Sequence, residues 1–273
     1  MKRNKRPVIQ LFTAINESAA SGKNGERNLK AVSYGPDREQ VMDLYLPVGY
    51  GQGTKTFILL HGGGWSGGSR SGVDYIVPVL QAQFPDYAVV NMDYRLASFD
   101  RPAFPMQVQD IERVLQFIGA AYGLNGPCAF IGVSAGAHLA LLYGYRHDAP
   151  HRVKAICSIV GPADFTDPFY AHHPYYQYAA MYLLGNAKKD HAAISGISPA
   201  QHAGPQSPPT ILFYGGKDPL VPISQAQRLK AKLDKHGVTN EYHAFPNGGH
   251  GGWSIADMNH LRENLLRFMQ QHF

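Results

Sequence analysis

Ser134 stands in a setting that is typical of a nucleophile. Gly132–Gly136 has the spacing Gly-x-Ser-x-Gly and joins the short apolar run Cys128–Val133 to a helical pattern that begins at Ala135. A serine on a tight strand-to-helix turn is crowded, so the flanking positions need glycines that tolerate close approach. The helix start also points backbone N–H groups at the place where an oxyanion would form. The pattern therefore predicts that Ser134 is a nucleophile.

A serine hydroxyl reacts well only when a base removes its proton and a carboxylate orients that base. The candidate base is His250, in a glycine-rich stretch that follows the last predicted strand. The candidate carboxylate is Asp218, which follows the predicted strand Thr210–Tyr214. Because Ser134, Asp218 and His250 all follow strands, we expect them to converge on one edge of a sheet.

A second glycine-rich segment, His61–Trp65, follows the predicted buried strand Thr56–Leu60. Three successive glycines expose backbone N–H donors that no side chain covers, as an oxyanion requires. We expect the N–H groups of Gly63, Gly64 and Ala135 to form an oxyanion hole. A flexible turn is one alternative. A phosphate-binding loop is another, which the lack of a following Gly-Lys-Ser/Thr disfavours.

Other candidate residues have simpler interpretations. Asp164 follows a predicted strand and is the rival carboxylate, but we expect it to cap or stabilise the entrance of the segment that follows. Asp110 and Glu112 lie on a predicted helix and are expected to be solvated or structural. His172 and His173 lack further ligands at a recognisable spacing, so we expect packing rather than metal binding. We therefore expect no metal site.

The elements that would position these residues alternate along the chain. From residue 29 onward, short apolar β-type runs alternate with longer helical patterns, which predicts a largely parallel sheet with helices on both faces. The first two strands are expected to form an antiparallel hairpin at the sheet edge. The predicted strands are Leu29–Tyr34, Gln40–Leu46, Thr56–Leu60, Tyr87–Tyr94, Cys128–Val133, Val153–Val160, Thr210–Tyr214 and Glu241–Ala244. The predicted helices are Gly72–Phe84, Met106–Tyr122, Ala135–Tyr145, Ser224–His236 and Ile255–His272.

Residues 162–207 depart from this alternation. They are rich in Pro, Tyr and His, and they contain no clear strand and one helical patch near Tyr175–Leu184. Long irregular insertions in compact domains are more often functional than structural, so we interpret this segment as a cap over the carboxyl edge of the sheet. Some of its aromatic side chains are expected to line an acyl or alcohol pocket. The pocket candidates are Trp65, Tyr175, Tyr176 and Tyr178.

The composition suits a globular protein. The chain has 273 residues, of which 44% are hydrophobic and 16% charged, so it can bury a large core, and disorder and coiled coil are poor interpretations. Its net charge of +5 lies wholly in the first 30 residues, which hold seven basic and two acidic side chains. We therefore predict a basic arm at residues 1–28, a domain at residues 29–273, and no nucleic-acid partner.

The sequence also bears on location and redox state. The apolar run near the N-terminus is interrupted by Gln10, Thr13 and Asn16, and no apolar segment approaches the roughly 20 residues that span a bilayer. Cys128 and Cys157 lie in apolar runs, so we expect reduced core thiols rather than a disulfide or a metal pair. We expect a cytoplasmic protein without a membrane span, and the sequence leaves a homodimer open.

In combination these segments resemble the α/β-hydrolase superfamily. Within it, they are similar to serine esterases and lipases with an HGGGW-type oxyanion motif, namely the BD-FAE-like and hormone-sensitive-lipase-like carboxylesterases. Many relatives have Asp-Ser-Ala-Gly-Gly where this chain has Val133–Ala137, which favours the BD-FAE-like or kynurenine-formamidase-like branches. The matching segments, in family order across about residues 30–273, are Asp43–Pro47, His61–Trp65, Asp93–Leu96, Gly132–Gly136, Gly215–Asp218 and Gly249–Gly251.

The resemblance implies an α/β-hydrolase fold of about eight strands with a small cap, and a serine hydrolase that needs no cofactor. Ser134 would attack an ester carbonyl, His250 would take and return the proton, and Asp218 would hold the imidazole. The expected substrates are small soluble esters with short acyl or aromatic groups. Arylformamidase or small-peptidase activity is the alternative, since the same triad cleaves amides. A non-catalytic scaffold is disfavoured because all three triad residues are present.

Overall fold

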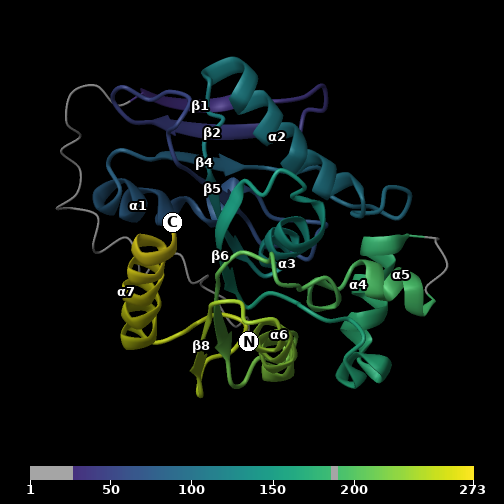
Figure 1. The fold of residues 1–273 in the computed structure, drawn as a ribbon. Coiled ribbons are helices and arrows are strands. Elements are labelled where there is room, and N and C mark those ends of the chain that lie inside the picture. The colour runs from purple at the N-terminus through teal and green to yellow at the C-terminus, as the bar shows by residue number, and fades with distance from the viewer. Residues whose placement is uncertain (1–26, 186–189) are drawn as a thin grey trace, which may run out of the picture.

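One eight-stranded sheet runs through the computed structural model, which describes residues 27–185 and 190–273 (Figure 1). The strand order is β1-β2-β4-β3-β5-β6-β7-β8. The strands are β1 (Arg27–Ser33), β2 (Val41–Leu46), β3 (Thr56–Leu60), β4 (Ala88–Met92), β5 (Cys128–Val133), β6 (Val153–Ile159), β7 (Thr210–Gly215) and β8 (Asn240–Phe245). Strand β2 pairs antiparallel with both β1 and β4, and every other pairing is parallel. Six neighbouring strands therefore end at the same edge of the sheet.

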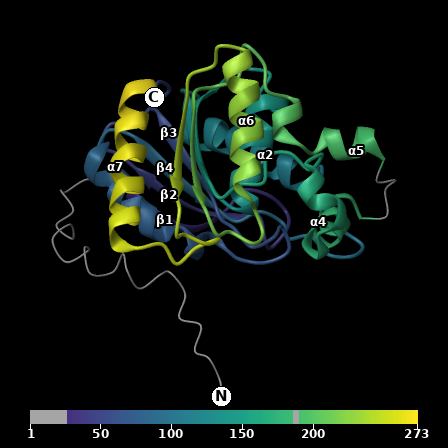
Figure 2. The ribbon, with the colours of Figure 1, turned by 90° about the horizontal axis from the view of Figure 1, so that it is seen from below.

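Helices cover both faces of the sheet. They are α1 (Val77–Gln83), α2 (Met106–Tyr122), α3 (Ala135–Leu142), α4 (Pro174–Leu184), α5 (His191–Gly196), α6 (Ile223–Lys235) and α7 (Ile255–His272). Figures 1 and 2 show α1 and α7 on one face, α2, α3 and α6 on the other, and α4 and α5 outside the second group. Two separate apolar cores fill the space on the two sides of the sheet. Central strands such as β3 are buried on both faces, which explains their continuous apolar sequences.

The predicted strands and the edge hairpin are confirmed, whereas two predicted helices differ from the structure. Helix α1 is shorter than the predicted Gly72–Phe84, because short 3₁₀ turns precede it and the helix starts at Val77. Pro78 lies in its first turn, the part of a helix that accepts proline, whereas a helix that began at Gly72 would place this proline in its interior. Helix α3 ends at Leu142 and continues as a π-helical turn, Tyr143–His147.

The segment 162–207 is more regular than the sequence indicates. It contains α4, which the pattern predicted, and the shorter helix α5, which it did not. Helix α5 has six residues, too few for helical periodicity to show. The helix is instead defined by its first turn, where the side chain of Asp190 accepts a hydrogen bond from the N–H of Ala193 at 3.0 Å.

Most of the predicted basic arm, residues 1–28, lies outside the described residues. Its last two residues already belong to β1, which begins at Arg27 rather than Leu29. Among the described helices, none is both long and apolar enough to cross a bilayer. Cys128 and Cys157 are both buried and free, and burial raises the pKa of the Cys128 thiol to about 12.

Candidate active site

Ser134 occupies a strained turn between β5 and α3. Its backbone has φ 52° and ψ −117°, a conformation that residues other than glycine rarely adopt. A Cβ at Gly132 would lie 2.5 Å from the Cα of Ala137, and one at Gly136 would lie 2.2 Å from the carbonyl oxygen of Leu60. The two glycines thus let β5, α3 and the end of β3 approach closely enough to hold this turn. The strain confirms the expected sharp elbow at Ser134.

The structure brings together the three residues proposed for catalysis. The Oγ of Ser134 lies 2.8 Å from Nε2 of His250, and Nδ1 of His250 lies 2.7 Å from Oδ2 of Asp218. A carboxylate can only accept, so Nδ1 carries the proton and Nε2 accepts from the serine hydroxyl. The other carboxylate oxygen, Oδ1, accepts from the N–H groups of Leu220 at 2.8 Å and Val221 at 3.0 Å. The buried carboxylate is therefore held by three hydrogen bonds.

Backbone hydrogen bonds join the loops that carry Asp218 and His250. Lys217 donates its N–H to the carbonyl of Gly248 at 2.8 Å, and Gly216 donates to the carbonyl of Phe245 at 2.8 Å. Strands β7 and β8 are neighbours in the sheet, so their following loops leave from adjacent positions. Main-chain hydrogen bonds therefore hold Asp218 and His250 close together although they are far apart in the sequence. These bonds do not depend on side-chain rotamers.

The glycine loop after β3 lies directly against the serine. A Cβ at Gly62 would stand 3.3 Å from the Cβ of Ser134. Within the described residues, the N–H groups of Gly63 and Gly64 donate to no protein acceptor. Ala135 is the first residue of α3, where backbone N–H groups have no partner inside the helix. Gly63 and Gly64 line the same cavity as Ser134, and Ala135 follows the serine directly in the chain, so the three N–H groups remain our candidates for the oxyanion hole.

His138 fixes the far end of the glycine loop, a role that the sequence did not reveal. The indole Nε1–H of Trp65 donates to Nδ1 of His138 at 3.1 Å. Because indole nitrogen only donates, His138 carries its proton on Nε2, which donates to the carbonyl of Ile197 at 2.8 Å. Complete burial lowers the pKa of His138 to about 4, so the ring stays neutral. Gln107 adds a hydrogen bond from its Nε2 to the carbonyl of Trp65 at 2.7 Å.

Ionic and ring contacts hold the residues that precede and follow the glycine loop. The guanidinium of Arg70 pairs with the carboxylates of Asp43, at 3.0 Å, and Asp93. The ring of His61 stacks on Tyr94 with centroids 4.2 Å apart. Burial lowers the pKa of His61, against smaller raising effects of the Gly62 carbonyl and Asp93. The carboxylates of Asp43 and Asp93, in two of the matching segments, therefore hold Arg70, which follows the glycine loop.

A cavity of about 470 Å³ opens beside Ser134, here named the aromatic cavity. Of the predicted pocket residues, Trp65, Tyr175 and Tyr178 line it, and the side chain of Tyr176 lies outside the described part of the chain. Leu220 and Val221 were missed, although their position directly after Asp218 and Pro219 could have indicated them. The lining residues are Gly62, Gly63, Gly64, Trp65, Val133, Ser134, Pro162, Phe165, Tyr170, Tyr175, Tyr178, Ala179, Leu220, Val221 and His250.

The remaining candidates serve structural roles. Asp164, the rival carboxylate, pairs with Nε of Arg228 at 2.8 Å. Asp110 is fully buried and pairs with Arg95 at 2.6 Å, so it is structural rather than solvated. His173 accepts from the N–H of Tyr175 at the start of α4, and the side chain of His172 is outside the described residues. Across residues 27–185 and 190–273, no group of three or more His, Cys, Asp or Glu could hold a metal ion.

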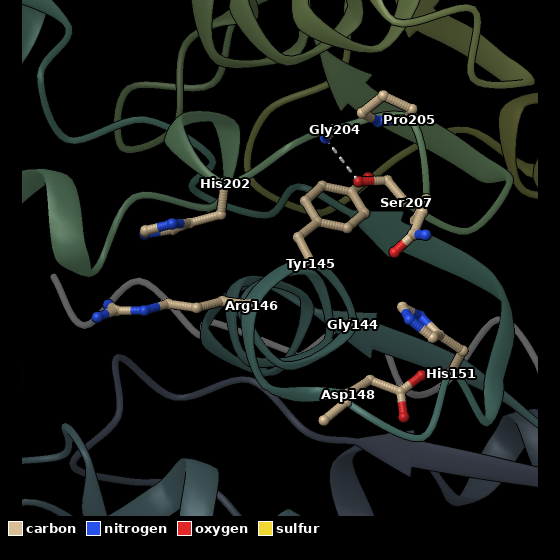
Figure 3. Close-up of a pocket in the computed structure, with 11 residues that line it drawn as sticks. Gly144, Tyr145, Arg146, Asp148, His151, His202, Gly204, Pro205 and Ser207 are labelled. Carbon is tan, nitrogen blue, oxygen red and sulfur yellow. Dashed lines mark hydrogen bonds between the residues drawn. The ribbon is translucent and has the colours of Figure 1, made fainter.

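A second cavity, of about 460 Å³, lies at the opposite edge of the sheet (Figure 3). Its lining includes Asp148 and Ser207, which lead into the amino ends of β6 and β7. Asp148 accepts from the N–H of Val153 at 2.7 Å, Arg146 donates to the carbonyl of Gly196, and the Ser207 hydroxyl accepts from a backbone N–H. Ligands of open α/β sheets bind at the carboxyl ends of the strands, so this cavity has the wrong location for the active site.

Two mycobacterial proteins with related sequences carry esterase names. Esterase LipQ of Mycobacterium tuberculosis is 25% identical over 240 residues, covering 80% of this chain and 56% of LipQ. Esterase LipC of the same organism is 25% identical over 245 residues, covering 81% of this chain and 59% of LipC. The chain thus matches less than two thirds of the length of these curated relatives.

Solved structures share the fold at low sequence identity. A bacterial heroin esterase superposes with a TM-score of 0.73 and 22% identity, covering 99% of this chain and 94% of its own. Esterase B from Lactobacillus rhamnosis superposes with a TM-score of 0.69 and 22% identity, covering 94% of this chain and 92% of its own. The fold is the α/β-hydrolase fold, as the sequence predicted. A BD-FAE family model matches residues 42–233, most of the described chain, and the protein therefore belongs to the BD-FAE family.

Proposed function

We propose that this protein is a serine carboxylic-ester hydrolase that acts on small esters through an acyl-enzyme. The observation that carries the proposal is the hydrogen-bonded series Ser134, His250 and Asp218, with unpaired glycine N–H groups beside the serine. The esterase names of the mycobacterial relatives and the family membership support the same reaction class.

The proposed reaction follows from the positions of the donors. Ser134 Oγ attacks the ester carbonyl carbon while its proton passes to Nε2 of His250. The carbonyl oxygen becomes an oxyanion that accepts from the N–H groups of Gly63, Gly64 and Ala135. The tetrahedral intermediate collapses, the C–O bond to the alcohol breaks, and His250 returns the proton to the leaving oxygen. Water then repeats the sequence, which releases the acid and restores the serine.

The aromatic cavity indicates which esters would fit. Its walls are aromatic and aliphatic, with the hydroxyl groups of tyrosines as the polar tips. No charged side chain other than the titratable His250 lines it among the described residues. A neutral ester with a short acyl or aromatic group therefore suits it better than an ionic substrate.

Covalent labelling tests the proposal directly. Wild-type protein should react with a fluorophosphonate probe and hydrolyse p-nitrophenyl acetate, and Ser134→Ala should lose both properties. Ser71→Ala, at an exposed serine outside the aromatic cavity, is the matched control and should keep both. Wild-type protein that resists the probe would revive a non-catalytic role. Faster cleavage of N-formylkynurenine or a peptide anilide than of any ester would assign an amide hydrolase instead.

The proposal extends to the domain division, the location and the partners of the protein. We retain a basic N-terminal arm and one domain with a cap at 162–207, but the domain begins at Arg27, where β1 begins, rather than at residue 29. The cap is supported by Tyr175, which lines the aromatic cavity together with Ser134. We also retain a cytoplasmic location and the absence of a nucleic-acid partner, on the sequence grounds given above. Size-exclusion chromatography decides between a monomer and a homodimer.

A further inference from the structure

A small cavity of about 150 Å³, here named the histidine-side cavity, lies on the other side of His250 from the aromatic cavity. It shares only Val133 and His250 with the aromatic cavity, and it does not touch Ser134, the glycine loop or the cap. Its remaining wall comes from the α1 and α7 face of the sheet. The lining of this wall includes Gly72, Tyr75, Trp253, Met258 and Leu261.

The two cavities therefore lie on opposite faces of the sheet. Phe165 and Leu220, which line the aromatic cavity, belong to or pack against the apolar core under α2, α3 and α6. Trp253 and Leu261, which line the histidine-side cavity, belong to the core under α1 and α7. His250 stands between them at the carboxyl edge and lines both cavities.

The chemistry of ester cleavage assigns different substrate groups to these two sides. In the tetrahedral intermediate the oxyanion must face Gly63 and Gly64, and the leaving oxygen must reach Nε2 of His250 for its proton. The alcohol group therefore extends past the histidine. The acyl group takes the remaining direction, which runs along Ser134 and the glycine loop into the aromatic cavity.

We propose that the histidine-side cavity binds the alcohol part of the ester and selects small alkyl alcohols, while the aromatic cavity binds the larger acyl part. This inference rests on the proposed esterase function. The cavity has about a third of the volume of the aromatic cavity, so it takes the smaller half of the substrate.

The lining of the histidine-side cavity favours an alkyl group over a polar alcohol. It contains no Asp, Glu, Lys or Arg. The indole N–H of Trp253 donates to the carbonyl of Gly249 at 2.8 Å, so the ring offers its apolar surface. Gly72 and Gly252 are exposed, whereas Leu261 is buried. The cavity therefore opens to solvent on the side of the two glycines, and the released alcohol can leave directly.

Each methylene of the alcohol that the cavity buries should raise kcat/KM by about fourfold until the cavity is full.

Two substitutions change the size of this cavity in opposite directions. A Cβ at Gly72 would meet no atom within 4 Å, and its φ is not in the left-handed region, so Gly72→Leu can fill the cavity. Met258 is half-buried, so Met258→Ala can enlarge it with little cost to the core. Gly53→Leu is the matched control, because Gly53 is exposed, has the same open surroundings and precedes β3 at the opposite edge of the sheet.

The experiment measures kcat/KM by pH-stat titration on two ester series. One series holds phenylacetate constant and varies the alcohol from methyl to n-butyl and n-hexyl. The other holds methanol constant and varies the acid from acetate to phenylacetate and decanoate. Gly72→Leu should lower the butyl-to-methyl ratio by at least about tenfold and leave the acyl ratios within about twofold. Met258→Ala should raise the hexyl-to-butyl ratio, and Gly53→Leu should change neither series.

The outcomes separate this inference from the proposed function. If wild-type protein neither reacts with the fluorophosphonate nor cleaves any of these esters, the proposed function and the inference both fail. If it does both but Gly72→Leu alters the acyl ratios instead of the alcohol ratios, the assignment of the two cavities is reversed and the inference is wrong. Unchanged ratios in folded Gly72→Leu and Met258→Ala proteins would overturn it as well, with the esterase function intact.

Discussion

The two sides of the aromatic cavity are held in place by different forces. On the sheet side, Ser134, His250 and Asp218 are fixed by a strained turn and by hydrogen bonds of 2.7 to 3.0 Å. On the cap side, Tyr175 and Tyr178 are 56% and 47% exposed and are held by ring contacts. We therefore expect the sheet side to determine the chemistry and the cap side to determine which ester fits.

The largest expected loss of activity comes from replacing Asp218, one of two carboxylates that follow neighbouring strands. Asp218→Asn should lower kcat by about 10⁴, because an amide cannot hold His250 in the required tautomer. Asp164→Asn is the matched control, since its partner is Arg228, and it should lower the melting temperature but keep kcat within tenfold. Steady-state kinetics and thermal melts of both variants measure this. A larger loss of kcat in Asp164→Asn would reassign the carboxylate.

The strained turn is the next test of the sheet side. Gly132→Ala should reduce kcat by about 10², because a Cβ there would lie 2.5 Å from the Cα of Ala137 and displace the serine. Gly51→Ala, where a Cβ meets nothing within 4 Å, should behave as wild type. Single-turnover kinetics on p-nitrophenyl acetate reports the acylation step. Full acylation by a folded Gly132→Ala protein would show that the close packing is dispensable.

The contact between Trp65 and His138 connects the two sides. Trp65→Phe keeps the ring but removes the N–H donor, which leaves Nδ1 of His138 buried without a partner. We expect about a tenfold loss of kcat with a smaller change in KM, because the glycine loop loses its anchor. The free energy of unfolding should fall by about 1–3 kcal/mol. A change in KM alone would mean that Trp65 contributes only to the cavity wall.

The neutral His138 predicts a pH dependence of stability. Its pKa is about 4 in the folded protein against an ordinary value of 6.5, so the unfolded chain binds the proton first as the pH falls. The free energy of unfolding should therefore decline from pH 6.5 toward pH 4, by about 2 kcal/mol between pH 7 and pH 5 from this residue. Urea titrations of wild type and His138→Gln at both pH values test it. Equal declines in the two proteins would contradict the prediction.

The smallest effect is expected on the cap side. Tyr178→Ala should raise KM for aromatic acyl esters by about threefold and leave kcat unchanged, because the half-exposed ring lines the aromatic cavity and would contact only the outer part of the acyl group. Tyr122→Ala, at a tyrosine outside the aromatic cavity, is the control. A loss of kcat in Tyr178→Ala would show that the cap also positions the reacting groups, and the division between the two sides would then fail.

The difference between the sheet side and the cap side also explains which parts of the site the sequence could predict. Ser134, Asp218 and His250 each follow a strand, and strand ends in a parallel sheet meet at one edge, so their convergence was predictable. The edge hairpin, α2 and α7 were also predicted from local patterns. The features of the site that were not predicted depend on tertiary contacts. No local pattern connects Trp65 with His138, which is 73 residues away, or places Leu220 in the cavity.

The buried thiols of Cys128 and Cys157 have a practical consequence. These are the only two cysteines in the sequence, and burial raises the pKa of each, so neither should react readily with maleimides in the native state. Gln177 lies exposed on α4. A cysteine introduced there would accept a single fluorophore without removal of native residues, and its emission during turnover would report whether the cap moves when an ester binds.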